Sequence, residues 1–258
     1  MDKLLVFFFG AIIGSFLNVC IHRLPKNISL IFPPSNCPNC KRGILWRDNI
    51  PILSYLLLGG RCRFCKARIS FRYAAVEALT AILLTLLFAA FGISQKFFAY
   101  SLMACGLIIA TFVDFEIREI PDQVSVGGLM AGLAASFLFP SLLDAPDRLH
   151  GLLYSFLGAL AGGGSIYIMG FLGELIFRRE AMGGGDVKLM AMIGAFLGWR
   201  PALVTFFVAP IFGAVVGVIL RIKDGREIIP YGPYLSLAAV VSIFFGENIL
   251  RVLFGGLF

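Results

Sequence analysis

Four cysteines between residues 37 and 65 have the spacing of a metal site. They form two Cys-x-x-Cys pairs separated by twenty-one residues: Cys37, Cys40, Cys62 and Cys65. Each pair can place two thiolates on a tight turn, and two turns supply the four sulfur ligands that tetrahedral zinc takes at about 2.3 Å. Because four cysteine ligands leave no open coordination position, we expect a structural zinc, with a redox pair or a catalytic zinc as the alternatives.

A second group of residues that could take part in catalysis is acidic. Four acids occupy nine consecutive positions, and another follows a glycine triplet much later: Asp114, Glu116, Glu119 and Asp122, then Asp186 after Gly183-Gly184-Gly185. Glycines accept positive φ values and let another backbone come close. Two carboxylates within hydrogen-bond reach cannot both ionise easily, so one keeps a proton while the other acts as a base. Such a pair could hydrolyse a peptide bond as aspartic proteases do.

Each of these acids also has a purely structural interpretation. Asp186 and Asp122 could cap the helices that follow them, and Asp114 could hydrate a helix end. Other protease types lack support, because there is no His-Glu-x-x-His, only two histidines exist and no serine-based arrangement stands out. Paired acids in a membrane also serve proton-coupled transport, and a membrane scaffold with a zinc ribbon is a further alternative. The residues alone do not choose between Asp114 and Asp122 as the partner of Asp186.

The composition sets the environment in which these residues act. Of 258 residues, 59% are hydrophobic and 14% are charged, against about 25% charged residues in soluble domains. Eight apolar runs cover 4–21, 78–93, 97–113, 124–143, 151–173, 189–199, 201–220 and 228–246. We therefore expect an all-α polytopic membrane protein with about eight transmembrane helices. The run 189–199 is short enough that a re-entrant or tilted segment is the alternative to a full crossing.

The net charge of +7 comes from one segment. Residues 22–73 hold ten Lys or Arg against one Asp, whereas the remainder holds twelve against fourteen acids. The positive-inside rule places this insert in the cytoplasm, with the N-terminus outside and the loops 114–122 and 178–188 on the cytoplasmic face. Basic side chains there suit anionic headgroups of membrane lipids, and we expect no nucleic-acid partner. The expected division is 1–24 first transmembrane helix, 25–72 cytoplasmic zinc-binding domain and 73–258 transmembrane protease core.

Glycines recur at a spacing that suits helix packing. Five Gly-x-x-x-Gly pairs lie in apolar runs: Gly10/Gly14, Gly128/Gly132, Gly158/Gly162, Gly194/Gly198 and Gly213/Gly217. This spacing places both glycines on one helix face and lets two backbones approach. Cys20 and Cys105 lie in apolar runs and are expected to be small buried side chains without chemistry.

Taken together, the motifs resemble the bacterial type IV prepilin peptidases, also called prepilin leader peptidase/N-methyltransferases, which are Gly-x-Gly-Asp intramembrane aspartic proteases. The resemblance runs nearly end to end and is carried by Gly14-Ser15-Phe16-Leu17-Asn18-Val19 with Arg23-Leu24-Pro25, the four cysteines, Asn49-Ile50-Pro51 with Ser54-Tyr55, Gly59-Gly60-Arg61-Cys62, Tyr73 with Glu77, Asp114 through Pro121-Asp122, and Gly183-Gly184-Gly185-Asp186-Val187-Lys188-Leu189.

This resemblance implies an activity and a site. It implies catalysis by Asp114 and Asp186 and zinc ligation by the four cysteines. The implied substrates are prepilins and pseudopilins, whose short basic leader is cut at the cytoplasmic face of the bacterial inner membrane. The new N-terminal residue would then be methylated with S-adenosylmethionine. Glu77 and Glu180 are candidates near the methyl donor, although spacing assigns neither that role. The acidic loop is expected to attract the basic leader, and the sequence does not determine the oligomeric state.

Overall fold

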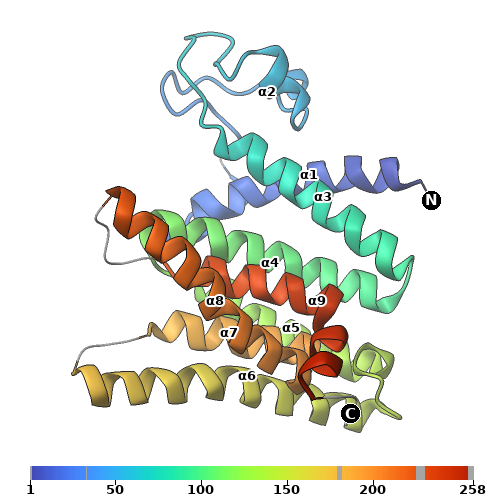
Figure 1. Cartoon of the computed structure of the whole chain (residues 1–258). Helices are drawn as coiled ribbons and strands as arrows, with labels where there is room; N and C mark the ends of the chain where they lie inside the picture. The colour runs from blue at the N-terminus through green and yellow to red at the C-terminus, as the bar shows by residue number, and fades with distance from the viewer. Residues whose placement is uncertain (1, 33, 179–181, 225–229, 255–258) are drawn as a thin grey trace. The chain divides into compact units, whose positions relative to one another are not determined.

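The computed structural model describes residues 2–32, 34–178, 182–224 and 230–254, and it is all-helical as predicted. Its helices are α1 Lys3–Arg23, α2 Leu53–Leu57, α3 Arg72–Phe91, α4 Gln95–Ile117, α5 Asp122–Leu138, α6 Arg148–Phe177, α7 Gly184–Leu197, α8 Trp199–Asp224 and α9 Gly232–Phe254, with 3-10 turns η1 Leu24–Lys26, η2 Trp46–Asp48 and η3 Pro140–Leu143 (Figure 1). The described residues form no strand, only two isolated bridges in the insert. Glu180 and the first two residues of the last predicted run lie outside the described residues.

Among the described residues, eight long helices correspond to the eight predicted apolar runs. Within the described chain, six of them are long and apolar enough to cross a membrane: α1, α3, α4, α6, α8 and α9. The other two are shorter, since α5 has 17 residues and α7 has 14. At 1.5 Å per residue α7 is about 21 Å long, less than the roughly 30 Å of a bilayer's hydrocarbon core. The chain is thus a multi-pass membrane protein, and full crossing by α5 and α7 stays a prediction.

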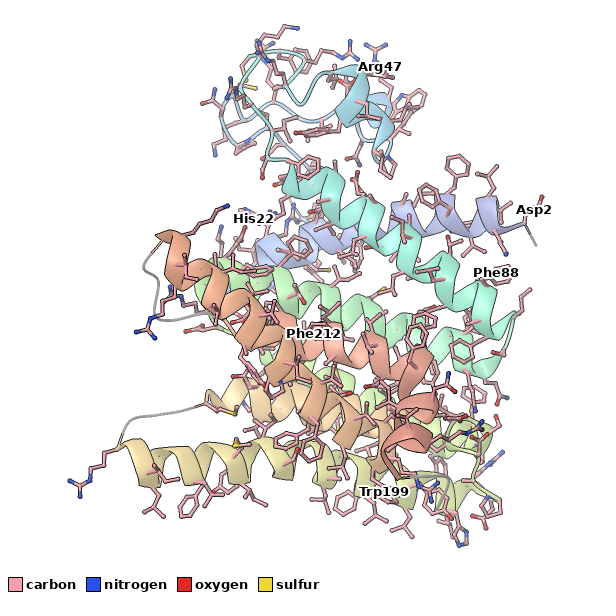
Figure 2. All side chains as sticks on the ribbon, viewed as in Figure 1. Asp2, His22, Arg47, Phe88, Trp199 and Phe212 are labelled. Atoms are coloured by element: carbon pink, nitrogen blue, oxygen red, sulfur yellow. The ribbon has the colours of Figure 1, made fainter. Side chains whose placement is uncertain are left out.

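The chain divides into two compact units, Met1–Ile93 and Ser94–Phe258. In the first unit α1 and α3 pack antiparallel with their backbones in contact. A Cβ on Gly10 would lie 2.7 Å from Cα of Ala81, and one on Gly14 would lie 2.7 Å from Cα of Glu77. Figure 2 shows the antiparallel order, with Asp2 and Phe88 at one end of the pair and His22 at the other. The predicted packing role of this glycine pair is confirmed.

Two buried polar side chains join the parts of the first unit. Asn18 on α1 donates from Nδ2 to the carbonyl oxygen of Tyr73 at 3.0 Å. Glu77 on α3 accepts at Oε2 from the backbone amide of Ile52 at 2.7 Å. Ile52 has φ of 62°, which is uncommon for a β-branched residue. The Glu77 bond therefore holds a strained turn of the insert against α3.

In the second unit, α7 lies at the centre of the bundle. It contacts α5, α6, α8 and α9, and residues from Leu189 to Leu197 are buried with the exception of Ala191. Figure 1 shows α6 and α7 running alongside each other. Their backbones touch, because a Cβ on Gly158 would collide with the carbonyl oxygen of Gly194. The Ser155 hydroxyl donates to the carbonyl oxygen of Ala195 at 2.7 Å and fixes the register of the two helices.

The ends of the helices explain how the chain reaches the site. Ser94 caps α4 by accepting from the amide of Phe97 at 3.2 Å, and Asp147 caps α6 by accepting from the amide of His150 at 2.9 Å. At its other end α4 stops at Arg118, whose φ of 57° is left-handed. Because the left-handed residue ends the helix, the chain turns one helical turn after Asp114.

The contact between Gly158 and Gly194 gives a stability prediction. Gly158→Ala should lower the free energy of unfolding by about 1–3 kcal/mol, the usual cost of overpacking a core. The matched control is Gly164→Ala on the same helix, where a Cβ meets nothing within 4 Å. That variant should be unchanged or gain up to about 1 kcal/mol of helix propensity. Thermal unfolding in detergent measures both, and equal melting temperatures for the two variants would contradict the packing.

Candidate active site

Asp114 lies in the last turn of α4 and is buried, with 5% of its surface exposed. Its Oδ2 accepts a hydrogen bond from the backbone amide of Gly232, the first residue of α9, at 2.9 Å. A Cβ on residue 232 would lie 2.8 Å from the same oxygen. Only glycine therefore allows this approach. The alternative in which Asp114 hydrates a helix end is wrong, because the carboxylate is enclosed by protein.

Asp186 is the third residue of α7 and does not cap the helix. The N-cap position belongs to Gly183, so the capping alternative for Asp186 is wrong. The amide of Asp186 donates to the carbonyl oxygen of Gly183 at 3.1 Å, and Oδ2 of Asp186 would lie 3.5 Å from a Cβ on Gly183. The helix begins within the glycine triplet, since glycine restricts the start of a helix less than other residues do. Asp186 is consequently carried on the first turn of α7 with its side chain folded back.

Ile120 contacts the backbone before Asp186 and the backbone that binds Asp114. A Cβ on Gly185 would lie 3.2 Å from Cβ of Ile120, and a Cβ on Gly232 would lie 3.2 Å from its Cδ1. The residue before Asp186 and the residue that donates to Asp114 therefore contact one side chain. At Gly185 the close neighbour is the side chain of Ile120, so the approach of another backbone to the glycine triplet stays a prediction.

The two carboxylates influence each other electrostatically. Asp186 belongs to α7, which is not among the six helices long enough to cross a membrane. Burial and the negative charge of Asp114 raise the pKa of Asp186 to about 6, against a smaller lowering by the Gly183 amide. Near that pH the pair holds one proton, which is the state that a carboxylate dyad needs for acid and base roles.

Asp122, the other candidate partner of Asp186, occupies a different environment. Its side chain is 63% exposed, and its Oδ1 accepts from Nζ of Lys188 at 2.7 Å. The N-cap of α5 is Pro121, so the expectation that Asp122 caps this helix is wrong. Lys188 also offsets part of the negative charge of the acidic loop. Burial thus separates Asp114 from Asp122, a distinction that the sequence alone leaves open.

Two residues of this site were missed by the sequence analysis. Gly232 holds Asp114 across 118 positions of the chain, and Tyr231 beside it has a buried hydroxyl. The local signal is Pro230-Tyr231-Gly232-Pro233 at the start of an apolar run. Proline and glycine together mark a constrained turn, and such a turn between two spans could have suggested a functional site.

The four cysteines of the insert meet at one point. Their sulfur atoms all lie within 4.8 Å of one another. Sγ of Cys37 and Sγ of Cys65 are 3.8 Å apart, which equals the edge of about 3.8 Å of a sulfur tetrahedron built with metal bonds of about 2.3 Å. Among the described cysteines, Cys20 and Cys105 lie outside this group. The donor set therefore fits a single metal ion.

The two cysteine turns share one backbone design. The amide of Cys37 donates to the Arg42 carbonyl at 2.9 Å, and the amide of Cys62 donates to the Ala67 carbonyl at 2.9 Å. In each turn a lysine after the second cysteine is left-handed, Lys41 and Lys66 both with φ of 59°. The turns also direct backbone amides at sulfur. The Ala67 amide contributes most to lowering the pKa of Cys65, to about 6, and thiolates are the form that binds metal.

The electrostatic link between the aspartates gives a direct test of the site. Replacing Asp114 by Asn removes a negative charge, so the pKa of Asp186 should fall below its value of about 6 in the unchanged protein. The control is Asp144→Asn, an exposed residue paired with Lys96, which should leave the pKa unchanged. Carbon NMR of labelled aspartate carboxyls in micelles measures the titration, and an unmoved Asp186 would show that the carboxylates are independent.

The sequences of both units match known protein families. Residues 8–91 match the Bacterial Peptidase A24 N-terminal domain, and residues 101–218 match the Type IV leader peptidase family. A Prepilin leader peptidase/N-methyltransferase of Pseudomonas aeruginosa is 36% identical over 94% of this chain and 90% of its own. A second Prepilin leader peptidase/N-methyltransferase, from Aeromonas hydrophila, is 35% identical over 96% of this chain and 92% of its own. A Type 4 prepilin-like proteins leader peptide-processing enzyme of Escherichia coli is 36% identical over 91% of each chain.

No solved structure matches the chain. The match to the leader peptidases extends over almost the whole length of both sequences. The resemblance found from the sequence motifs is thereby confirmed, and the chain belongs to the type IV leader peptidase family.

Proposed function

We propose that this chain is an aspartic endopeptidase that removes the leader peptide of type IV prepilins and pseudopilins with Asp114 and Asp186. Its relatives are named for leader peptidase and N-methyltransferase activities. The observation that carries the assignment of the two aspartates is the enclosed carboxylate of Asp114, held by Gly232, beside an Asp186 whose pKa its charge raises.

The surroundings of the two acids suggest separate roles. Burial disfavours the ionised form of Asp114, and the hydrogen bond from the Gly232 amide offsets part of that cost because it stabilises the carboxylate charge. Asp186 keeps a proton up to about pH 6 because of burial and the neighbouring charge. We therefore assign Asp114 as the general base and Asp186 as the general acid.

The proposed reaction is hydrolysis of the scissile peptide bond by an attacking water molecule. Asp114 takes a proton from water while the water oxygen bonds to the scissile carbonyl carbon, and Asp186 gives its proton to the carbonyl oxygen. When the resulting diol collapses, the carbon–nitrogen bond breaks and Asp114 passes its proton to the leaving nitrogen. Asp186 recovers a proton from the diol hydroxyl, and the carboxylic acid and free amine leave.

The acidic loop supports a basic leader as substrate. Glu116 and Glu119 are exposed beside the end of α4, while Asp122 is already paired with Lys188. At a Debye length of about 8 Å the attraction acts over a short range, so it orients a bound leader more than it recruits one. We propose that this face is cytoplasmic, that the protein resides in the bacterial inner membrane, and that 1–24, 25–72 and 73–258 are its functional divisions.

Methylation of the new N-terminal residue is the second activity, with S-adenosylmethionine as co-substrate. The relatives' names include N-methyltransferase. Glu77 was a candidate for this site, but its carboxylate is buried against the Ile52 amide, which gives it a structural task. The other candidate, Glu180, lies outside the described residues. The methyl donor is therefore assigned to no residue.

The peptidase proposal is tested with a co-expressed prepilin in cells that lack their own leader peptidase. Asp114→Asn and Asp186→Asn should each lower cleavage by at least about 10³-fold, because each removes one member of an acid–base pair. Mass spectrometry of the prepilin reports leader removal and methylation together. Asp144→Asn, exposed and paired with Lys96, is the control and should cleave normally.

Retention of cleavage by either folded dyad variant would overturn the peptidase assignment. Thermal unfolding in detergent establishes that each variant folds. A transporter that uses the same acids predicts vectorial proton flux in proteoliposomes and no cleavage, and a scaffold predicts neither activity.

We further propose that the cysteine cluster binds one structural zinc ion. Zinc supports the insert because a segment of this size has few apolar side chains to bury, and four thiolates leave the ion no free position. The ion would hold the two cysteine turns together. It would take no part in the chemistry at Asp114 and Asp186.

The zinc proposal predicts one zinc per chain in the purified protein, by elemental mass spectrometry. Cys37→Ser should lose the metal and let trypsin cut between Cys40 and Cys62 faster, because metal binding supplies folding energy. Cys20→Ser, which changes a buried cysteine outside the cluster, should keep a full equivalent. Iron in place of zinc, or full zinc in Cys37→Ser, would contradict the assignment.

A further inference from the structure

The hydroxyl of Tyr231 is a polar group without a partner at the candidate active site. Its oxygen is buried and makes no hydrogen bond to any residue of the described chain. Tyr231 directly precedes Gly232, whose amide holds Asp114. A buried hydroxyl without a partner is destabilising, so it requires an explanation when its residue adjoins the one that binds Asp114.

The ring of Tyr231 is held between two elements. Its position in the chain is set by the Gly232 bond, and its Cε2 would lie 3.8 Å from a Cβ on Gly213 of α8. Its hydroxyl belongs to the residue next to the one whose amide binds Asp114. The hydroxyl forms no hydrogen bond with Asp114 or Asp186 in this structure. The phenol is thus held at the residue next to Gly232, and neither acid binds its hydroxyl.

We propose that Tyr231 is a further catalytic residue, whose hydroxyl donates a hydrogen bond to the carbonyl oxygen of the peptide bond that is cut. This inference rests on the proposed function of Asp114 and Asp186. The carbonyl oxygen gains negative charge as water attacks, and a donor fixed in advance stabilises that charge most where water is excluded. The hydroxyl keeps its proton throughout, while Asp186 supplies the proton that is transferred.

The environment of Tyr231 suits a donor and not a base. Burial and the nearby Asp186 raise the pKa of Tyr231 to about 12, so the phenol stays protonated at every pH at which the dyad can work. A hydroxyl that oriented Asp186 directly would be expected to bond to it before substrate arrives. An unpartnered donor is instead what a site prepared for an incoming carbonyl oxygen requires.

The experiment compares Tyr231→Phe with the matched control Tyr234→Phe in the full-length enzyme. Tyr234 lies on the next turn and also contacts Gly213. With purified prepilin in detergent, Tyr231→Phe should lower kcat by about 10²-fold, the usual effect of losing one such donor, with KM unchanged within about threefold. Tyr234→Phe should cleave like the unchanged enzyme. The pH dependence of the remaining activity should keep its alkaline limb, because the dyad is intact.

The melting temperature of Tyr231→Phe gives a second test, because the proposal predicts the direction of its change. Since the hydroxyl has no partner in the described chain, its removal should leave the melting temperature unchanged or raise it. A lower melting temperature would mean that the hydroxyl holds the fold, and would overturn the proposal. A kcat within threefold of the unchanged enzyme would overturn it as well. A shift of the alkaline limb of the pH–activity curve would also overturn the proposal, because Tyr231 would then act through Asp186.

The dyad variants make the two possible failures distinguishable. If Asp114→Asn or Asp186→Asn still cleaves, the proposed function fails whatever Tyr231 does. If both are inactive while Tyr231→Phe retains its kcat, only the role of Tyr231 fails.

Discussion

The hydrogen bond from the Gly232 amide to Asp114 is the interaction on which the site depends. An enclosed carboxylate without a donor would cost several kcal/mol, and this single bond, across 118 positions, offsets part of that cost. It requires α4 to end at Arg118, α9 to begin at Gly232 and residue 232 to lack a Cβ. The positions of α4, α9 and the Asp114 carboxylate are therefore not independent of one another.

The sequence predicted the features whose signals are local. Eight apolar runs gave the eight long helices, and the Cys-x-x-Cys spacing gave the sulfur cluster, because each depends on neighbours within a few residues. The choice between Asp114 and Asp122 was not predictable from the residues, since it depends on burial by a helix that begins more than a hundred positions later. The alternative in which Asp186 caps α7 is wrong, because the preceding glycines allow the helix to begin before it.

Glu77 is a second residue whose role depends on contacts that the sequence does not show. Its expected place on the same face as the aspartates made Glu77 a candidate for methyl transfer, whereas its carboxylate holds Ile52 in a strained turn. Its partner is 25 positions earlier, in a segment whose course is set by the cysteine turns. A charged residue that binds a backbone amide has the same local sequence pattern as one that binds a ligand. Only the arrangement of the chain in space separates the two.

The central position of α7 has a consequence for the membrane in which the protein works. A helix that faces acyl chains must match the thickness of the bilayer, or it tilts or deforms the lipid around it. Residues 189–197 of α7, with the exception of Ala191, are buried, and α7 contacts α5, α6, α8 and α9, so this part of the helix is fitted to protein neighbours. The first turn that carries Asp186 can therefore keep its depth when the surrounding bilayer thins or thickens, and lipid remodelling during growth need not displace it.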